Sequence, residues 1–211
     1  MIITKIKRIA STNRYHLYAD EQWQGIFLDE ILAIYKLKTD QEIDEDDFKK
    51  IKKENDRKVS FDMAVCYMEK YVVSQKGIKD YLKKKGFDDQ TISATIDKLK
   101  DYGYVDDEKF ARNYFDSLTA SKGKRAIANK LREKGIAKEI IDDLVEEIED
   151  EDEISKASIL AEKFAKNREK SLKNKQKCLA HLVRKGYDYT VAQQATNNVF
   201  NSYEGENDDW I

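Results

Sequence analysis

Two histidines and two cysteines carry almost all the metal-ligating and nucleophilic chemistry that this 211-residue sequence offers. Cys178 and His181 are spaced i and i+3, so a helix would place them on one face. Two ligands do not complete a zinc site, and we expect no metal. His16 stands alone, which leaves little material for general-base catalysis. Cys66 and Cys178 form no close-spaced motif, which predicts two reduced thiols packed as small hydrophobic residues and no disulfide.

The remaining candidate for chemistry is the dipeptide Gly123-Lys124, which resembles the end of a phosphate-binding loop. It lacks the earlier glycine and the preceding strand that such a loop needs, so we expect no nucleotide hydrolysis. Carboxylates are too abundant for spacing alone to select a catalytic pair. The sequence therefore predicts a protein that is not an enzyme, uses no cofactor and works by binding.

Composition favours a helical protein. Charged residues make up 38% of the chain, hydrophobic residues 40%, and proline is absent. Proline is the strongest helix breaker, and Lys, Glu, Leu and Ala are good helix formers. The start of the chain lacks the apolar core of a signal peptide, and runs such as Ile31–Tyr35 are far too short to cross a bilayer. We expect a soluble, cytoplasmic protein without a membrane partner.

The first 57 residues predict a small mixed cap. Residues 2–27 hold short β-branched and aromatic runs around turn-forming residues, which indicates two or three strands. Residues 28–35 have helical spacing of apolar residues, and Asp44 has the position of an N-cap that opens a charged helix.

From about Phe61 the chain repeats at a period of roughly 50 residues. The anchors are Leu82-Lys83-Lys84-Lys85-Gly86-Phe87, Leu131-Arg132-Glu133-Lys134-Gly135-Ile136 and Leu182-Val183-Arg184-Lys185-Gly186-Tyr187. Each has a core leucine, basic residues in the last helical turn, a glycine suited to a left-handed C′ position and an apolar residue that folds back. Each anchor therefore predicts a helix stop.

Helical stretches flank every anchor. Residues 64–73, 110–118 and 159–164 precede the anchors, and single apolar faces follow them at Ile92, Ile96 and Leu99, at Ile141, Val145 and Ile148, and at Val191, Ala195 and Val199. We therefore predict a mainly α fold with three tandem three-helix repeats in an elongated, curved array after the strand-containing cap. The expected domains are residues 1–57 (cap), 58–105, 106–152, and 153–211 with an acidic C-terminal tail.

Two ordered motifs resemble the RecX family of recombinase regulators. The first is the glycine-aromatic-aliphatic-Asp turn Gly103-Tyr104-Val105-Asp106, which leads into Phe110-Ala111. The second is the basic-glycine segment Ser121–Arg125, which runs into the anchor that ends at Ile136. The resemblance covers about three quarters of the chain and is weakest in the third repeat, where it survives mainly as Leu182, Lys185, Gly186 and Tyr187. It implies regulation, typically inhibition, of the RecA recombinase in recombination and DNA repair, by binding in the groove of the RecA filament on DNA.

The charges are segregated along the second half of the chain. An acidic run between Asp142 and Glu153 is expected to dock one repeat onto the next or to shield a basic side. Two basic groups are the predicted partner-binding residues. The first is Lys122, Lys124, Arg125, Lys130, Arg132 and Lys134, and the second is Lys163, Lys166, Arg168, Lys170, Lys173, Lys175, Lys177, Arg184 and Lys185. Few carboxylates lie between Lys163 and Lys185, whereas an inert surface normally mixes both signs.

Two kinds of partner remain open. The leading hypothesis is a monomer that binds the RecA filament through these cations. The alternative is a direct nucleic-acid binder that uses its repeats as degenerate helix-turn-helix units, and weak DNA contact is compatible with filament binding. Acidic residues such as Asp88, Asp89 and Asp142 after the glycines disfavour a recognition helix there. For the aromatic residues Tyr67, Tyr71, Tyr102, Tyr104, Tyr114 and Phe115, core packing is favoured over base stacking.

Overall fold

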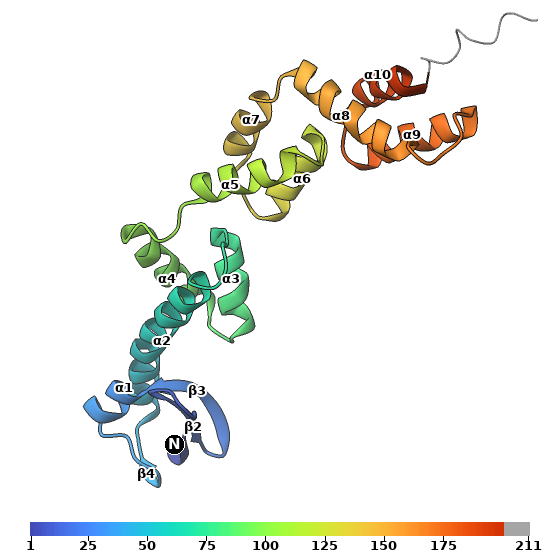
Figure 1. Cartoon of the computed structure of the whole chain (residues 1–211). Helices are drawn as coiled ribbons and strands as arrows, with labels where there is room; N and C mark the ends of the chain where they lie inside the picture. The colour runs from blue at the N-terminus through green and yellow to red at the C-terminus, as the bar shows by residue number, and fades with distance from the viewer. Residues whose placement is uncertain (201–211) are drawn as a thin grey trace, which may run out of the picture. The chain divides into compact units, whose positions relative to one another are not determined.

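The computed structural model describes residues 1–200 (Figure 1). The strands are β1 (Ile2–Arg8), β2 (Arg14–Ala19), β3 (Gln22–Leu28) and β4 (Gln41–Glu42). The helices are α1 (Asp29–Ile34), α2 (Glu45–Met68), α3 (Gln75–Lys84), α4 (Asp89–Asp101), α5 (Asp107–Thr119), α6 (Lys124–Glu133), α7 (Lys138–Glu146), α8 (Asp150–Ala165), α9 (Leu172–Arg184) and α10 (Tyr189–Phe200). This confirms the mainly helical fold class with strands in an N-terminal segment. The expected acidic tail falls on residues 201–211, outside the described residues.

The chain divides into two compact units between Asp106 and Asp107. The first unit contains the sheet and helices α1 to α4, and the second contains α5 to α10. Helix α2 is continuous across residues 57 and 58, where the sequence predicts a domain boundary. The residue limits of the predicted domains stay predictions.

The sheet is antiparallel, with the strand order β3-β2-β1-β4. The expected strands are present, and short β4 adds a further one beside β1. Asp20 and Glu21 both have positive φ, at 47° and 64°, in the two-residue turn between β2 and β3. A turn of that kind matches the right-handed twist of the strands that it connects.

Helix α2 joins the sheet to the first group of three helices. It begins after Asp44, whose carboxylate accepts hydrogen bonds from the backbone N–H groups of Asp46 (2.8 Å) and Asp47 (3.2 Å), as the N-cap prediction requires. It ends at Met68, so the charged helix after Asp44 and the helix expected over residues 64–73 are one element. One hydrophobic core therefore serves both the sheet and helices α2 to α4.

Buried Asn55 fixes α2 to the sheet. Its amide Nδ2 donates to the carbonyl oxygen of Ile26 at 2.8 Å, and its Oδ1 accepts from the backbone N–H of Leu28 at 3.0 Å. Phe27 and Phe48 stack nearby with their ring centroids 5.9 Å apart. The side chain of Asn55 thereby satisfies backbone groups of β3 that would otherwise be buried without a partner.

The three glycine stops have the predicted geometry. Gly86, Gly135 and Gly186 have φ values of 89°, 80° and 91°. At each stop the apolar residue after the glycine donates its N–H to the carbonyl of the anchor leucine: Phe87 to Leu82 (3.4 Å), Ile136 to Leu131 (3.2 Å) and Tyr187 to Leu182 (3.2 Å). This six-to-one hydrogen bond, with the left-handed glycine, is the Schellman motif. The prediction from the anchors is confirmed.

Each later group of three helices has its own core. Helices α5 to α7 bury residues such as Phe110, Leu131 and Ile141. Helices α8 to α10 bury alanines of α8 and α10 together with Cys178 and Leu182 of α9. Alanines allow α8 and α10 to pack closely, which leaves α9 with one buried side and one side toward solvent.

Two expectations about packing are wrong. Cys66 is an exposed free thiol, although Cys178 is buried as expected. Phe115 is buried, but Tyr71, Tyr102 and Tyr104 are more than half exposed, so core packing does not explain them. Among residues 1–200, no helix is both long and apolar enough to cross a bilayer.

Candidate partner-binding surface

The second group of predicted cations lies on the outer side of the last three helices and on the loop before α9. It is called the α9 basic group and comprises Lys163, Lys166, Arg168, Lys170, Lys173, Lys175, Lys177, Arg184 and Lys185. The Ser171 hydroxyl opens α9 by accepting from the N–H of Asn174 at 3.4 Å. Cys178 and Leu182 face the core, which turns the basic residues of the helix outward. Exposed members of the group are Lys163, Lys166, Arg168, Lys170, Lys173, Lys177 and Arg184, whereas Lys175 and Lys185 are partly buried.

Most of this group forms no ion pair among the described residues. Among the residues that the structure describes, Lys163, Lys166, Arg168, Lys173, Lys177, Arg184 and Lys185 form no ion pair. Arg168 is held in place instead by Phe164: its guanidinium carbon lies 4.0 Å from the ring centroid, and its Nη1 donates to the backbone carbonyl of that residue. Such stacking restricts the Arg168 side chain before any partner binds.

Burial, together with nearby positive charge, shifts the titration of a histidine within this surface. Burial first, then the charges of Lys185 and Arg184, lowers the pKa of His181 below its ordinary value. The ring of His181 also lies 5.4 Å from that of Phe164. His181 is therefore a neutral packing residue at neutral pH, and the anion-attracting charge comes from the lysines and arginines around it.

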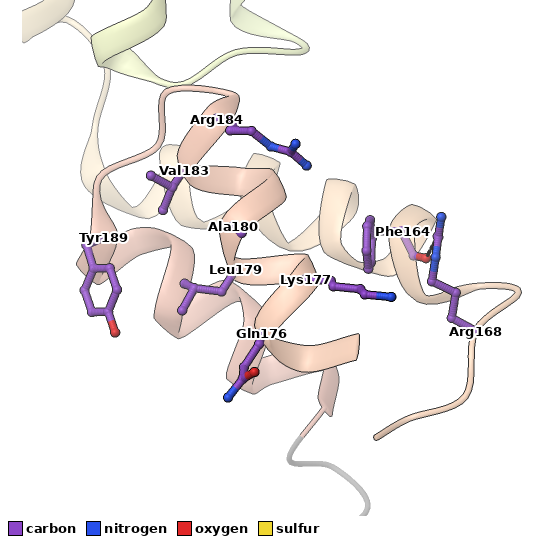
Figure 2. A pocket seen from close by; sticks show the side chains of 9 residues that line it. All are labelled: Phe164, Arg168, Gln176, Lys177, Leu179, Ala180, Val183, Arg184 and Tyr189. Carbon is purple, nitrogen blue, oxygen red and sulfur yellow. Dashed lines mark hydrogen bonds between the residues drawn. The ribbon is translucent and has the colours of Figure 1, made fainter. Parts of the chain in front are cut away.

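An open groove of about 780 Å³ lies over the outer side of α9. Its lining residues are Phe164, Arg168, Gln176, Lys177, Leu179, Ala180, Val183, Arg184 and Tyr189 (the α9 groove). Figure 2 shows Lys177 and Arg184 on one side of α9, with Phe164 and Arg168, and Leu179, Val183 and Tyr189 on the other. The groove therefore combines a basic side with an apolar side and contains no carboxylate.

Half of the first group of predicted cations is paired with carboxylates within the molecule. It is called the α6 basic group and comprises Lys122, Lys124, Arg125, Lys130, Arg132 and Lys134. Lys124 Nζ lies 2.7 Å from Asp150 Oδ1 and 3.8 Å from Glu153 Oε2, and Arg125 lies 3.7 Å from Asp188. A second set of contacts engages the end of α6: Lys130 pairs with Glu133, Arg132 donates to Asn129, and Lys134 lies over the Tyr114 ring. The structure thus distinguishes the two predicted groups, because three of the six cations of the α6 basic group are paired with carboxylates, whereas seven of the nine cations of the α9 basic group form no ion pair among the described residues.

The amino-terminus of α6 forms a joint with α8 and with the stop of α9. The backbone N–H groups of Gly123 and Arg125 donate to the carbonyls of Lys185 (3.1 Å) and Gly186 (3.2 Å). The N–H of Lys124 donates to Oε1 of Glu153, which is 3% exposed. These acceptors satisfy N–H groups that a helix start leaves open, and the carboxylate suits the positive end of the helix dipole.

Glycine is required at this joint for a steric reason. A Cβ atom on Gly123 would lie 2.5 Å from the carbonyl oxygen of Gly186 and from the backbone nitrogen of Tyr187. The acidic run takes part in the joint through Asp150 and Glu153, which confirms the expectation that it docks one repeat onto the next. Sequence reasoning missed Glu153 as a cap and Phe164, Ala180 and Tyr189 as groove residues, because their roles arise only when separate helices meet.

Comparison with known proteins places the chain in a family. A model described as the second three-helix domain of RecX matches residues 106–144, which contain α5, α6 and most of α7. A protein named Regulatory protein RecX from Listeria welshimeri is 32% identical over 195 residues, which cover 90% of this chain and 72% of that protein. Its namesake from Clostridium perfringens strain 13 is 33% identical over 198 residues, which cover 90% and 93%. The chain belongs to the RecX family.

Solved RecX structures have the same fold. One crystal structure of regulatory protein RecX covers 93% of this chain and 98% of its own, with a TM-score of 0.64 and 23% identity. RecX from Lactobacillus salivarius covers 68% and 96%, with a TM-score of 0.61 and 24% identity. The RecX relatives are named as regulatory proteins and not as enzymes, which agrees with a binding function. The α9 groove lies outside the residues that match the RecX domain model.

Proposed function

We propose that this RecX-family chain binds in the groove of the RecA recombinase filament on DNA and inhibits the recombinase. The observation that carries the proposal is the row of exposed cations around α9 that have no anionic partner among the described residues. Several cations at fixed spacing attract an acidic protein wall or a phosphate chain, and both are present in a recombinase filament on DNA. The chain would act in the cytoplasm as a monomer.

The test compares three probes: bare single-stranded DNA, free recombinase, and recombinase assembled on the same DNA. Binding is measured for the full chain at two salt concentrations, together with the rate of ATP turnover by the recombinase. We expect the assembled filament to bind at least tenfold more tightly than either component and its ATP turnover to fall. Equal affinity for bare DNA and for the filament, without a change in turnover, would contradict the proposal.

Direct contact with nucleic acid is the second candidate, and exposed aromatic residues of the first unit favour it. Tyr102 and Tyr104 lie with their ring centroids 5.9 Å apart, and Lys98 Nζ lies 4.4 Å from the ring centroid of Phe61 and 5.8 Å from that of Tyr102. Exposed rings beside a cation provide stacking surfaces for unpaired bases. This chemistry differs from the degenerate helix-turn-helix reading, which requires a helix inserted into a duplex groove.

The two candidates respond differently to one pair of substitutions. Replacing Tyr102 and Tyr104 by serine should weaken binding to single-stranded DNA if these rings stack with bases, by about 1–3 kcal/mol per base lost. The same change should leave filament binding unaltered if the α9 basic group is the contact surface. A loss of both activities would make the aromatic residues part of one shared surface.

A further inference from the structure

The outer side of α9 carries an apolar row that the core of the last three helices does not need. Cys178 and Leu182 already supply the buried stripe of the helix. Val183 is nevertheless 38% exposed and Tyr189, at the start of α10, is 59% exposed. A helix that only covers a core presents a polar outer face, so a second apolar row indicates that another surface packs there.

The basic row runs parallel to this apolar row. Lys177 and Arg184 are seven residues apart, which places them on the same side of the helix about 10 Å apart along its axis. Arg168 extends this side from the loop after α8, where its stacking on Phe164 fixes its direction. The charge of the row therefore selects an anion that can span about two helical turns.

Ala180 lies between the two rows and lines the groove. Its side chain is small and exposed, so the surface is lowest there. A partner backbone can approach α9 closely at this position, with its side chains directed to both rows. The shape, the charge and the apolar side thus point to one kind of occupant.

We propose that the α9 groove binds an acidic amphipathic segment of the partner protein, with carboxylates along one edge and aliphatic or aromatic side chains along the other. The carboxylates pair with Lys177, Arg184 and Arg168, and the apolar edge covers Leu179, Val183 and Tyr189. This inference rests on the proposed function and names the chemistry that the recombinase must present. A phosphate chain fits less well, because it has no aliphatic groups for Leu179 and Val183.

The experiment uses the full chain and the recombinase filament assembled on an oligothymidine strand. Three variants change the groove: Lys177→Gln with Arg184→Gln removes charge, Val183→Gln with Tyr189→Gln removes the apolar row, and Ala180→Trp fills the low point. All five positions are exposed, so the fold should tolerate the changes, and melting temperatures check this. Matched controls are Ile159→Gln on α8 and Lys79→Gln with Lys84→Gln in the first unit, which are exposed and do not line the groove.

We expect each groove variant to reduce filament affinity at least tenfold and each control to change it less than twofold. If only the charge variant loses filament affinity, charge alone accounts for binding. That result would overturn the groove inference and leave the proposed function standing. If the wild-type chain itself does not bind the filament, the proposed function and the inference both fail.

Affinity measurements of the same kind also test two other possible occupants of the α9 groove. If the apolar variant weakens binding to the bare oligothymidine as much as to the filament, nucleic acid occupies the groove and the inference is overturned. Neutralising Glu204, Glu206, Asp208 and Asp209 in the full chain tests the chain's own acidic residues. A tenfold gain in filament affinity would assign the groove to those residues and overturn the assignment to a partner, whereas a change below twofold supports it.

Discussion

Tyr187 lies buried at the stop of α9, with 1% of its surface exposed and its hydroxyl without a hydrogen-bond partner among the described residues. A buried polar group without a partner costs roughly 1–3 kcal/mol, while the ring itself contributes packing. We therefore expect Tyr187→Phe to raise the free energy of unfolding by about 1 kcal/mol, measured by urea denaturation at pH 7. A destabilised variant would show that the hydroxyl has a partner in solution.

The same hydroxyl makes a second prediction, for alkaline solution. Burial, and then the negative charge of Glu153, raises the pKa of Tyr187 to about 12. The folded pKa lies above the unfolded value near 10, so the associated stability is complete below pH 10 and is lost as pH rises toward 12. Between pH 10 and pH 12 the free energy of unfolding of the wild type should fall by about 2 kcal/mol more than that of Tyr187→Phe, measured by urea denaturation at each pH. An equal fall in the free energy of unfolding of both proteins would contradict the raised pKa of Tyr187.

Single residues show where sequence reasoning stopped. The Asp44 cap and the left-handed glycines were predictable because each depends on a few neighbouring residues. Burial of Glu153 and exposure of Cys66 were not, because they depend on which helices pack together. The sequence indicates that the acidic run contacts another part of the chain, but it does not show which carboxylate accepts hydrogen bonds at the start of a neighbouring helix.

At the scale of helices, the repeated anchors predict that replacing any of the three stop glycines by alanine lowers the free energy of unfolding by the same amount. The structure shows that Gly86 and Gly186 differ in their surroundings. Gly86 and Gly186 have nearly equal φ values, 89° and 91°. A Cβ atom at Gly86 would meet open space, whereas one at Gly186 would overlap Ala126 and lie 2.8 Å from its Cα atom. The Gly186 position therefore carries a packing restriction beyond its conformation.

This difference gives a matched pair of substitutions. Gly86→Ala should lower the free energy of unfolding by about 1 kcal/mol, the cost of a left-handed alanine. Gly186→Ala should cost roughly 1–3 kcal/mol more, because α6 must move. Amide exchange should also accelerate at Gly123, Lys124 and Arg125, whose N–H groups donate across the joint. Equal destabilisation, with no change in exchange, would contradict the steric account.

Helix boundaries, like single residues, were predictable only where the signal lies in a few neighbouring residues. The stops at residues 86, 135 and 186 were readable because a glycine with its flanking residues forms a local motif. The continuity of α2 from Glu45 to Met68 was not predictable, because no local signal shows that the charged helix after Asp44 and the helical stretch over residues 64–73 are one element. Its position is decided by contacts such as Asn55 with β3, which join residues far apart in the chain.

Across the whole chain, the segregation of charge was visible in the sequence, but the pairing of charge was not. Lys124 pairs with Asp150 and Glu153, which lie 26 and 29 residues away. Such pairs depend on tertiary structure, so the α6 basic group and the α9 basic group look equivalent in the sequence. The structure makes them unequal, and this inequality can be tested by reversing the charge of each group.

Reversal to glutamate at Lys166, Arg168, Lys170 and Lys173 should leave the melting temperature nearly unchanged, because these side chains are exposed. If each cation contributes on the order of 1 kcal/mol at the filament, affinity should fall by about three powers of ten. Reversal at Lys124, Arg125 and Arg132 should instead lower the melting temperature, since Lys124 would face Asp150 and buried Glu153 with like charge. The salt dependence of filament binding should become shallower in the first variant, because fewer cations meet anions. Undiminished inhibition of recombinase ATP turnover by a folded first variant would exclude this surface, and the exposed aromatic residues of the first unit would then be the next surface to test.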